Sequence, residues 1–380
     1  MARFLHLADI HLGFDRYDNK ERTHDFFQAF QDALERYAVQ EQVDFVLLVG
    51  DLFEHRNIQP ATLNQAQFCL RMLQEVGIPV LAIEGNHDNR PYGTKTSWLR
   101  YLADWGLLIL LEPGDTTAGE ELYFPWDGHR GSYIDLDCGV RVLGSYWYGA
   151  SAPNAIAQLA PAIQALPPTP HPHIHKNYEL EGWIFNPGSI EANSMEESSF
   201  ARGVYLVDIQ KDKIQAELKQ DYYQRSLIRL RLTAKGSESV EELKQGAIAL
   251  MQQAIAQKRV IPAEKPIVEL RLEGQVGFDR LELDVKSLQQ ELQEMSNALI
   301  FLLKYDVDTV AYASPLADDA NRRQIEQEVF MDMLAAHNTY KKRALELAQG
   351  LIELKDWQLE GRSEEELYQF VQSLLISEEA

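Results

Sequence analysis

Apolar residues in the first 90 positions follow two alternating periods. Short β-rich apolar runs occupy residues 3–8, 44–49 and 79–84. Between the first two runs, apolar residues recur at helical spacing, namely at Phe26, Phe27, Phe30, Leu34 and Tyr37. After Pro60, which suits a helix start, the same spacing links Leu63, Ala66, Leu70 and Leu73. This β-α-β-α-β order predicts a parallel sheet with helices on its faces.

Two later segments have the pattern of β-hairpins. Residues 132–145 would turn at Cys138–Gly139, and residues 203–218 would turn at Lys211–Asp212. An α/β core with added antiparallel strands predicts an α/β fold with some α+β character, a two-sheet sandwich flanked by helices. We expect residues 1–223 to form this domain.

A change of pattern after Tyr223 predicts a second, smaller domain at residues 224–315. Apolar runs at residues 226–232, 266–272 and 298–305 alternate with helical segments at residues 240–257 and 281–295. The order is again β-α-β-α-β, and the segment is large enough to fold independently.

Residues 321–380 are highly charged and have helical periodicity, which predicts a helical tail. Two apolar stripes are separated by the polar residues 360–366; they consist of Ile325, Val329, Phe330, Met333 and Leu334, and of Leu367, Phe370, Val371, Leu374 and Leu375. Such helices usually cover a core, but the sequence offers no third element on which both stripes could pack. The pattern therefore favours a tail that docks a partner.

Charge and composition limit the function classes. The net charge of -22 argues against a protein that coats nucleic acid by bulk attraction, although bound metal ions would still allow a nuclease. No apolar run reaches the roughly 18–20 residues of a membrane span. Asp9 interrupts any signal-like N-terminal region, so we expect a cytoplasmic protein. Cys69 and Cys138 lie in apolar segments and are expected to be buried free thiols.

Polar residues with metal-binding chemistry follow each of the three N-terminal strands. They are Asp9 and His11, then Asp51, and then Asn86, His87 and Asp88. The carboxyl ends of parallel strands lie at one edge of a sheet, where α/β folds place their sites. A single D-x-H or G-D motif could consist of polar residues on the surface or contain a structural histidine. All three motifs in order are much more specific for a binding site.

Local geometry would help these side chains converge. In an extended D-x-H segment, Asp9 and His11 point to the same side of the backbone. Gly50 and Gly85, which precede the second and third motifs, would let the chain turn sharply off each strand. We therefore expect one site at this edge of the sheet.

The motifs D-x-H, G-D and G-N-H-D resemble those of the calcineurin-like metallophosphoesterase superfamily. GDLFEHRNIQPATL (residues 50–63) and FNPGSIEAN (residues 185–193) resemble more narrowly the SbcD-like nuclease subunits of the SbcCD DNA-repair complex. The resemblance extends over nearly the whole chain. It implies an exonuclease or endonuclease of double-strand-break repair that hydrolyses phosphodiesters at a two-metal centre.

The resemblance also implies the ligands of two divalent metal ions. They would be Asp9, His11, Asp51, Asn86, His173 and His175. Asp51 would bridge the ions, Asn86 and His173 would complete the second site, and the other three would complete the first. The family typically uses manganese, and oxygen and nitrogen ligands suit manganese, iron or zinc better than calcium.

The resemblance implies a catalytic residue beside these ligands. His87 would stay off the metals and either protonate the leaving oxygen or stabilise the transition state. Asp88 would orient either the loop or the His87 imidazole.

The last metal motif follows a proline-rich segment, PPTPHPHIHK (residues 167–176). His173 and His175 match the H-x-H motif of the family, whereas His171 is left over and would more often be solvated than bound to metal. Four prolines within residues 165–172 exclude the strand that should precede this motif.

A further metal histidine of the family has no counterpart in this chain. His129 lies between the G-N-H-D and H-x-H motifs but follows no strand. We infer that a strand–loop–helix–strand block of roughly 30 residues is absent between Pro172 and His173. The first domain would then be shortened there, and its second metal site would be weakened.

The resemblance implies partners as well. The tail would bind the coiled-coil base of an SbcC-like ATPase of the SMC family, DNA would be the substrate, and helices near residues 59–77 and 95–106 would form a homodimer contact. The protein would then associate with the nucleoid and with no membrane. Two alternatives stay open: a phosphoesterase acting on nucleotides or phosphoproteins, and a catalytically weak structural subunit that still docks the ATPase. The second domain and the tail argue against the former, and the absent block favours the latter.

Overall fold

The computed structural model describes residues 1–88, 90–91, 93–116, 119–167, 186–210, 213–309, 322–335, 340 and 343–376. The chain divides into two compact units; the first comprises Met1–Leu232, Gln245–Arg271 and Val285–Tyr305, and the second Thr233–Lys244, Leu272–Asp284 and Asp306–Ala380. None of the helices described is long and apolar enough to cross a membrane.

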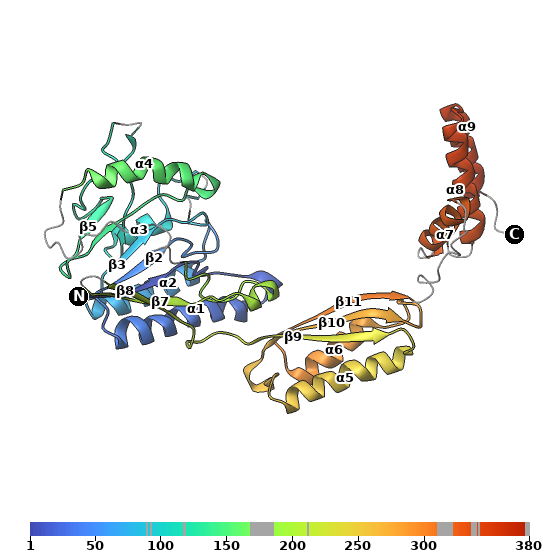
Figure 1. The fold of residues 1–380 in the computed structure, drawn as a ribbon, viewed down its shortest axis with the longest axis horizontal. Coiled ribbons are helices and arrows are strands. Elements are labelled where there is room, and N and C mark those ends of the chain that lie inside the picture. The colour runs from blue at the N-terminus through green and yellow to red at the C-terminus, as the bar shows by residue number, and fades with distance from the viewer. Residues whose placement is uncertain are drawn as a thin grey trace. The chain divides into compact units, whose positions relative to one another are not determined.

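A six-stranded sheet organises the N-terminal part of the first unit (Figure 1), with the order β4-β3-β2-β1-β7-β8. Its strands are β1 (Ala2–Leu7), β2 (Phe45–Val49), β3 (Val80–Ile83), β4 (Ile109–Leu110), β7 (Val204–Gln210) and β8 (Lys213–Lys219). Strands β1 to β4 are parallel, whereas β7 pairs with β1 and β8 in antiparallel fashion. The three predicted N-terminal strands and the hairpin at residues 203–218 are confirmed, although its turn at 211–212 lies outside the described residues.

Helices cover one face of this sheet with the apolar residues that predicted them. They are α1 (Lys20–Leu34), continued by the π-helical segment Glu35–Gln40, then α2 (Pro60–Glu75) and α3 (Trp98–Asp104). Phe26, Phe30 and Leu70 are fully buried in one cluster with Leu5 and Val46 of the strands. Burial of these side chains fixes α1 and α2 against the sheet. Both helices predicted from the sequence are therefore confirmed.

A second, two-stranded sheet packs on the opposite face. Strands β5 (Tyr133–Asp135) and β6 (Arg141–Leu143) form an antiparallel hairpin within the predicted residues 132–145. Ile134 of β5 packs against the buried cluster of Phe45, Leu81 and Leu111. The α/β sandwich flanked by helices is therefore confirmed, and both cysteines are free, Cys69 buried and Cys138 half-buried.

One helix of this region was not predicted. Helix α4 (Ala152–Gln164) contains Pro161 in its interior, and proline is unfavourable there because it removes a hydrogen-bond donor. Residues 168–185 lie outside the described part of the chain. The H-x-H motif with His173 and His175, the extra His171 and the junction at Pro172 therefore stay predictions.

The predicted β-α-β-α-β order after residue 223 is confirmed. The elements are β9 (Leu227–Lys235), α5 (Val240–Ala256), β10 (Ile267–Val276), α6 (Val285–Ser296) and β11 (Ile300–Thr309). The strands form a sheet of order β11-β10-β9, and Figure 1 shows both helices on the same side of it.

The described part of the tail contains three helices. They are α7 (Arg322–Ala335), α8 (Ala344–Leu359) and α9 (Glu364–Ile376). Helix α8 packs against both others; its Ala348 and Ile352 are buried, and the ring of its Trp357 lies 4.5 Å from that of Phe370 on α9. The expectation that the two apolar stripes have no third element to pack on is therefore wrong. Helix α8 was overlooked because much of its buried face consists of small residues.

Candidate metal centre

Three of the predicted ligands lie on two loops that run side by side beyond the ends of β1 and β2. The amide of Asp9 donates to the oxygen of Gly50 (3.2 Å), and the amide of His11 donates to the oxygen of Asp51 (2.9 Å). Side-chain ligand atoms of Asp9, His11 and Asp51 all lie within 4.8 Å of one another. The structure thus brings these three side chains together, while their role as metal ligands stays a prediction.

The backbone at these three residues is left-handed. The φ angles are 51° at Asp9, 51° at His11 and 53° at Asp51. Such conformations cost about 1–3 kcal/mol per non-glycine residue and are concentrated at functional sites. Strand β1 ends at Leu7, so the expectation of an extended D-x-H segment is wrong. Left-handed turns and hydrogen bonds between the two loops align the side chains instead.

Glycine is needed for different reasons at the two positions that precede the second and third motifs. Gly50 has a φ of 86°, so it provides the sharp turn that was expected. Gly85 is not in the left-handed region, but a Cβ atom there would lie 2.2 Å from Oδ1 of Asp51. Its predicted role as a turn residue is therefore wrong; glycine is required because the Asp51 carboxylate lies against the backbone.

Asp88 joins the second and third motif loops. Its buried carboxylate accepts hydrogen bonds from the amides of Leu52 (3.3 Å), Phe53 (3.2 Å) and Gly85 (3.0 Å). Burial raises the pKa of Asp88 to about 6, although these amides act in the opposite direction. Of the two roles considered for Asp88, these contacts support orientation of the loop rather than of the His87 imidazole.

Replacement of Asp88 by alanine should therefore destabilise the protein. Three buried amides would lose their acceptor, and each unsatisfied donor costs about 1–3 kcal/mol. We expect the free energy of unfolding of metal-free protein, measured with urea, to fall by at least about 3 kcal/mol. Asp104→Ala, at the exposed end of α3, is the control and should change it little. An unchanged stability of D88A would contradict the anchoring role.

His87 is held at both its backbone and its ring. Its amide donates to Oδ1 of Asp51 (2.8 Å), and its Nδ1 atom lies 2.6 Å from the main-chain oxygen of Glu54. A carbonyl oxygen only accepts, so Nδ1 carries a proton. The Nε2 atom is then the ring nitrogen available to a bound substrate. The His87 ring also lies edge-on to that of His11, with centroids 5.0 Å apart.

These side chains line a polar pocket of about 580 Å³. The lining residues are Asp9, His11, Phe14, Asp15, Arg16, Asp51, Glu54, Asn86, His87, Asn193 and Glu197. Glu54, Asn193 and Glu197 were not predicted as site residues. Glu54 and Asn193 stand in the two segments that carried the narrower resemblance, whereas nothing in the sequence pattern pointed to Glu197.

The segment from Asn186 onward closes this pocket from the side of β7. The amide of Ile190 donates to the main-chain oxygen of Asp9 (3.3 Å). The main-chain oxygen of Ile190 in turn accepts a hydrogen bond from the hydroxyl of Tyr222 (2.7 Å). Arg22 on α1 donates to the oxygen of Ala192 (2.6 Å). These contacts hold Asn193 next to the motif loops.

The electrostatics of the pocket fit a divalent cation. Burial raises the pKa of Asp9, and the neighbouring carboxylates of Asp51 and Glu197 raise it further. Burial alone would lower the pKa of His11, but Glu54, Asp51 and Asp9 raise it above its usual value. Carboxylates held this close repel one another unless a cation lies between them. Oxygen and imidazole donors in this arrangement suit a transition metal such as manganese or zinc.

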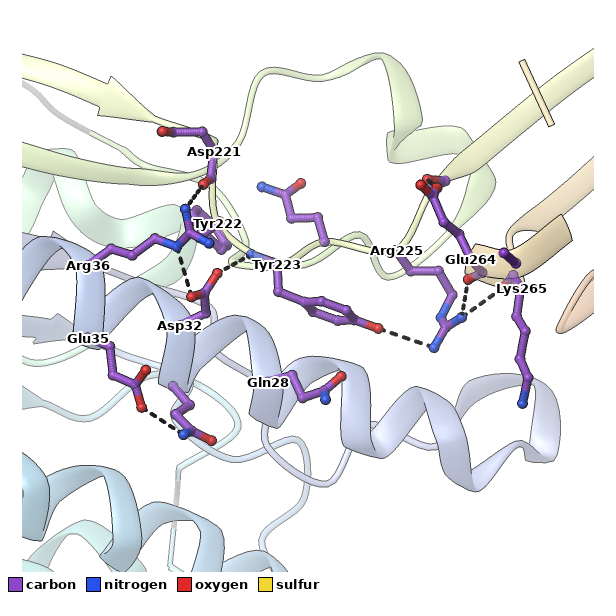
Figure 2. A pocket seen from close by; sticks show the side chains of 14 residues that line it. Gln28, Asp32, Glu35, Arg36, Asp221, Tyr222, Tyr223, Arg225, Glu264 and Lys265 are labelled. Atoms are coloured by element: carbon purple, nitrogen blue, oxygen red, sulfur yellow. Dashed lines mark hydrogen bonds and ion pairs between the residues drawn. The ribbon is translucent and has the colours of Figure 1, made fainter. Parts of the chain in front are cut away.

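A larger hollow of about 880 Å³ lies beside helix α1 (Figure 2). Its basic side chains are paired with acidic residues in or next to its lining. Arg36 bonds to Asp32, and Arg225 pairs with Asp25 and donates to the main-chain oxygens of Glu264 (3.1 Å) and Lys265 (2.7 Å). These contacts tie the segment after β8 to α1, and they give the hollow a structural role.

Comparisons with known proteins agree with this geometry. Residues 2–140 match the calcineurin-like phosphoesterase family (Metallophos). The chain is similar to several proteins named DNA double-strand break repair protein Mre11. It is 43% identical to that of Archaeoglobus fulgidus over 86 residues, which are 23% of this chain and 19% of the relative.

Two further relatives of the same name extend the match. Identity is 29% over 219 residues with the Methanosarcina mazei protein, covering 51% of this chain and 34% of the relative. It is 25% over 373 residues with the Haloferax volcanii protein, covering 87% and 81%. The chain thus spans 19% and 34% of the length of the first two relatives and 81% of the length of the Haloferax volcanii protein. Residues 2–140 are therefore a calcineurin-like phosphoesterase domain.

Proposed function

We propose that this chain is a metal-dependent DNA nuclease, the SbcD- or Mre11-like subunit of a double-strand-break repair complex. The observation that carries the proposal is the cluster of Asp9, His11 and Asp51 on left-handed loops, with His87 beside it in one pocket. The similarity to Mre11 proteins supports DNA as the substrate.

The residues present suggest how two divalent ions would be held. Asp9 and His11 would bind the first, Asp51 would be shared, and Asn86 would bind the second; the remaining predicted ligands, His173 and His175, lie outside the described residues. Manganese is the metal we favour. Bound ions would polarise the phosphodiester and supply a hydroxide at neutral pH.

His87 would act on the substrate directly. The Glu54 carbonyl holds its Nδ1 atom, so Nε2 can hydrogen-bond to a phosphate oxygen or deliver a proton to the leaving oxygen. The Asp51 carboxylate fixes the backbone of His87, which keeps the imidazole at the edge of the ligand cluster. We assign no metal to His87.

The proposal includes an SMC-family ATPase as the partner of the C-terminal helices. On α7, Val329 and Met333 are one helical turn apart and are 51% and 67% exposed although α8 covers another face. An apolar strip of this kind suits helix-in-groove docking. With a net charge of -22, attraction to DNA would come mainly from the partner and the metal ions. The complex would act at the nucleoid in the cytoplasm.

Replacement of His87 by alanine tests the assignment. In a chain whose second metal site is restored by an insertion between Pro172 and His173, manganese-dependent cleavage of linear double-stranded DNA should fall by roughly 10²–10⁴-fold, the usual contribution of a positioned acid or base. Metal content, measured by mass spectrometry of the purified protein, should stay unchanged. His129→Ala is the matched control, because His129 is exposed and only its backbone makes the hydrogen bonds described. Loss of metal from H87A would instead make His87 a ligand.

A comparison of substrates separates the alternatives. A phosphoesterase for nucleotides or phosphoproteins would cleave those substrates and leave DNA intact. A catalytically weak structural subunit would cleave neither, would bind the ATPase, and would gain no nuclease activity when the second metal site is restored by an insertion between Pro172 and His173. Either outcome would replace the proposed nuclease function.

A further inference from the structure

Glu54 contacts the imidazoles of both His11 and His87, and the proposed chemistry leaves its side chain unused. It follows β2 on the Asp51 loop, and its amide donates to the oxygen of Leu12 (3.0 Å). This bond lies next to the bridge between Leu12 and Phe53. The backbone of Glu54 is thus fixed to the D-x-H loop, and its side chain is 19% exposed at the pocket wall.

The contacts of Glu54 with the two histidines are different. Its side-chain Oε2 lies 2.8 Å from Nδ1 of His11, and its main-chain oxygen lies 2.6 Å from Nδ1 of His87. The buried Nδ1 of His11 makes no hydrogen bond of regular geometry among the described residues, and the Glu54 carboxylate is its close charged neighbour. Nε2 of His11 lies on the other side of the ring, 3.8 Å from Oδ1 of Asp9.

We propose that Glu54 is a positioning residue that keeps the proton of His11 on Nδ1 and so presents Nε2 to the metal. Its carbonyl does the same for His87, leaving that Nε2 free for substrate. A carboxylate behind a ligating imidazole fixes the tautomer and ring orientation and increases the basicity of the ligand. The inference rests on the proposed function in one respect, namely that the Asp9–His11–Asp51 cluster binds metal.

A direct ligand role for Glu54 is the competing explanation. The ligand atoms of His11, Glu54 and His87 also lie within 4.8 Å of one another, so these groups could hold an ion themselves. An ion bound through Nδ1 of His87 would require that nitrogen to lose its proton. The contact of Nδ1 of His87 with a carbonyl oxygen, which needs that proton, favours the positioning role.

Two variants and two measurements test the proposal. Glu54→Ala removes the acceptor, Glu54→Gln keeps an acceptor without the charge, and Glu75→Ala, at an exposed position on α2, is the control. Nitrogen-15 NMR of the imidazoles in metal-free protein at alkaline pH should show the His11 proton on Nδ1 in the wild type, E54Q and E75A. In E54A the proton should shift towards Nε2. Manganese affinity, measured by calorimetry, should fall about 10–100-fold in E54A and recover to within about threefold of wild type in E54Q.

The outcomes separate this inference from the proposed function. An unchanged His11 tautomer and unchanged affinity in E54A would overturn the positioning role. Equal loss of one metal equivalent in E54A and E54Q would make Glu54 a ligand, which also overturns it. The NMR measurement uses neither metal nor DNA. A tautomer shift in E54A of a protein that cleaves no DNA would therefore retain the role of Glu54 and reject only the nuclease function.

Discussion

Replacement of Asp51 by asparagine is expected to abolish metal-dependent hydrolysis of a generic phosphodiester. The buried carboxylate would be shared by both ions, so the substitution removes charge from each of them. Asparagine keeps a side-chain oxygen that can accept the amide of His87, so the loop geometry is largely preserved. Initial rates with bis(p-nitrophenyl) phosphate, in manganese and in chelator, measure the effect; D51N in manganese should equal wild type in chelator.

Asp104→Asn is the matched control for this prediction. It makes the same change in net charge at an exposed position on α3 and should retain the wild-type rate. The pair of variants should also be made in the chain with the grafted block described below, where the starting rate is expected to be higher. Wild-type activity of D51N in either background would rule out the shared-ligand assignment.

The second large effect concerns the number of metal ions. We expect tight binding of at most one manganese ion per chain, with weak nuclease activity or none. The first site would keep Asp9, His11 and Asp51 if the H-x-H segment reaches it. The second site would depend on a histidine that follows four prolines without a preceding strand, and ordering such a segment costs conformational entropy. Calorimetric titration of metal-free protein gives the stoichiometry.

A graft tests the cause of this deficit. Insertion of a strand and a histidine-bearing loop between Pro172 and His173, taken from an intact family member, should restore a second tight site and nuclease activity. The same insertion with alanine in place of its histidine is the control and should bind one ion. Two tightly bound ions and full activity in the chain without the graft would mean that His171 or another group supplies the missing ligand.

The sequence was sufficient to predict the main elements and the edge of the sheet at which three of the polar side chains meet. Continuous apolar runs and helical spacing predicted β1, β2, β3, α1 and α2, because burial against one sheet leaves a periodic trace in the chain. The polar motifs after three successive strands predicted a shared edge, because parallel strands end on the same side. Asp9, His11 and Asp51 do meet there.

The structural roles of individual residues were less predictable from the sequence. Gly85 and Gly50 look alike in sequence, but Gly50 has a left-handed φ and Gly85 avoids the Asp51 carboxylate. The sequence left two roles open for Asp88, orientation of the loop or of the adjacent imidazole, and only the structure shows its carboxylate bonded to amides 35 and 36 positions earlier as well as to a nearby one. Distances of this kind follow from how loops meet and have no periodicity along the chain.

The apolar pattern by itself therefore determined the sandwich, the β-α-β-α-β segment and the edge that carries the motifs. Tertiary structure decided how the ligands converge, through left-handed turns at Asp9, His11 and Asp51 that no strand pattern implies. It also revealed Glu54 beside both imidazoles, and α8 in contact with both α7 and α9 of the tail. The physical reason is the same in each case: burial of apolar faces is encoded locally, whereas hydrogen bonds and strained turns depend on which distant segment the fold places alongside.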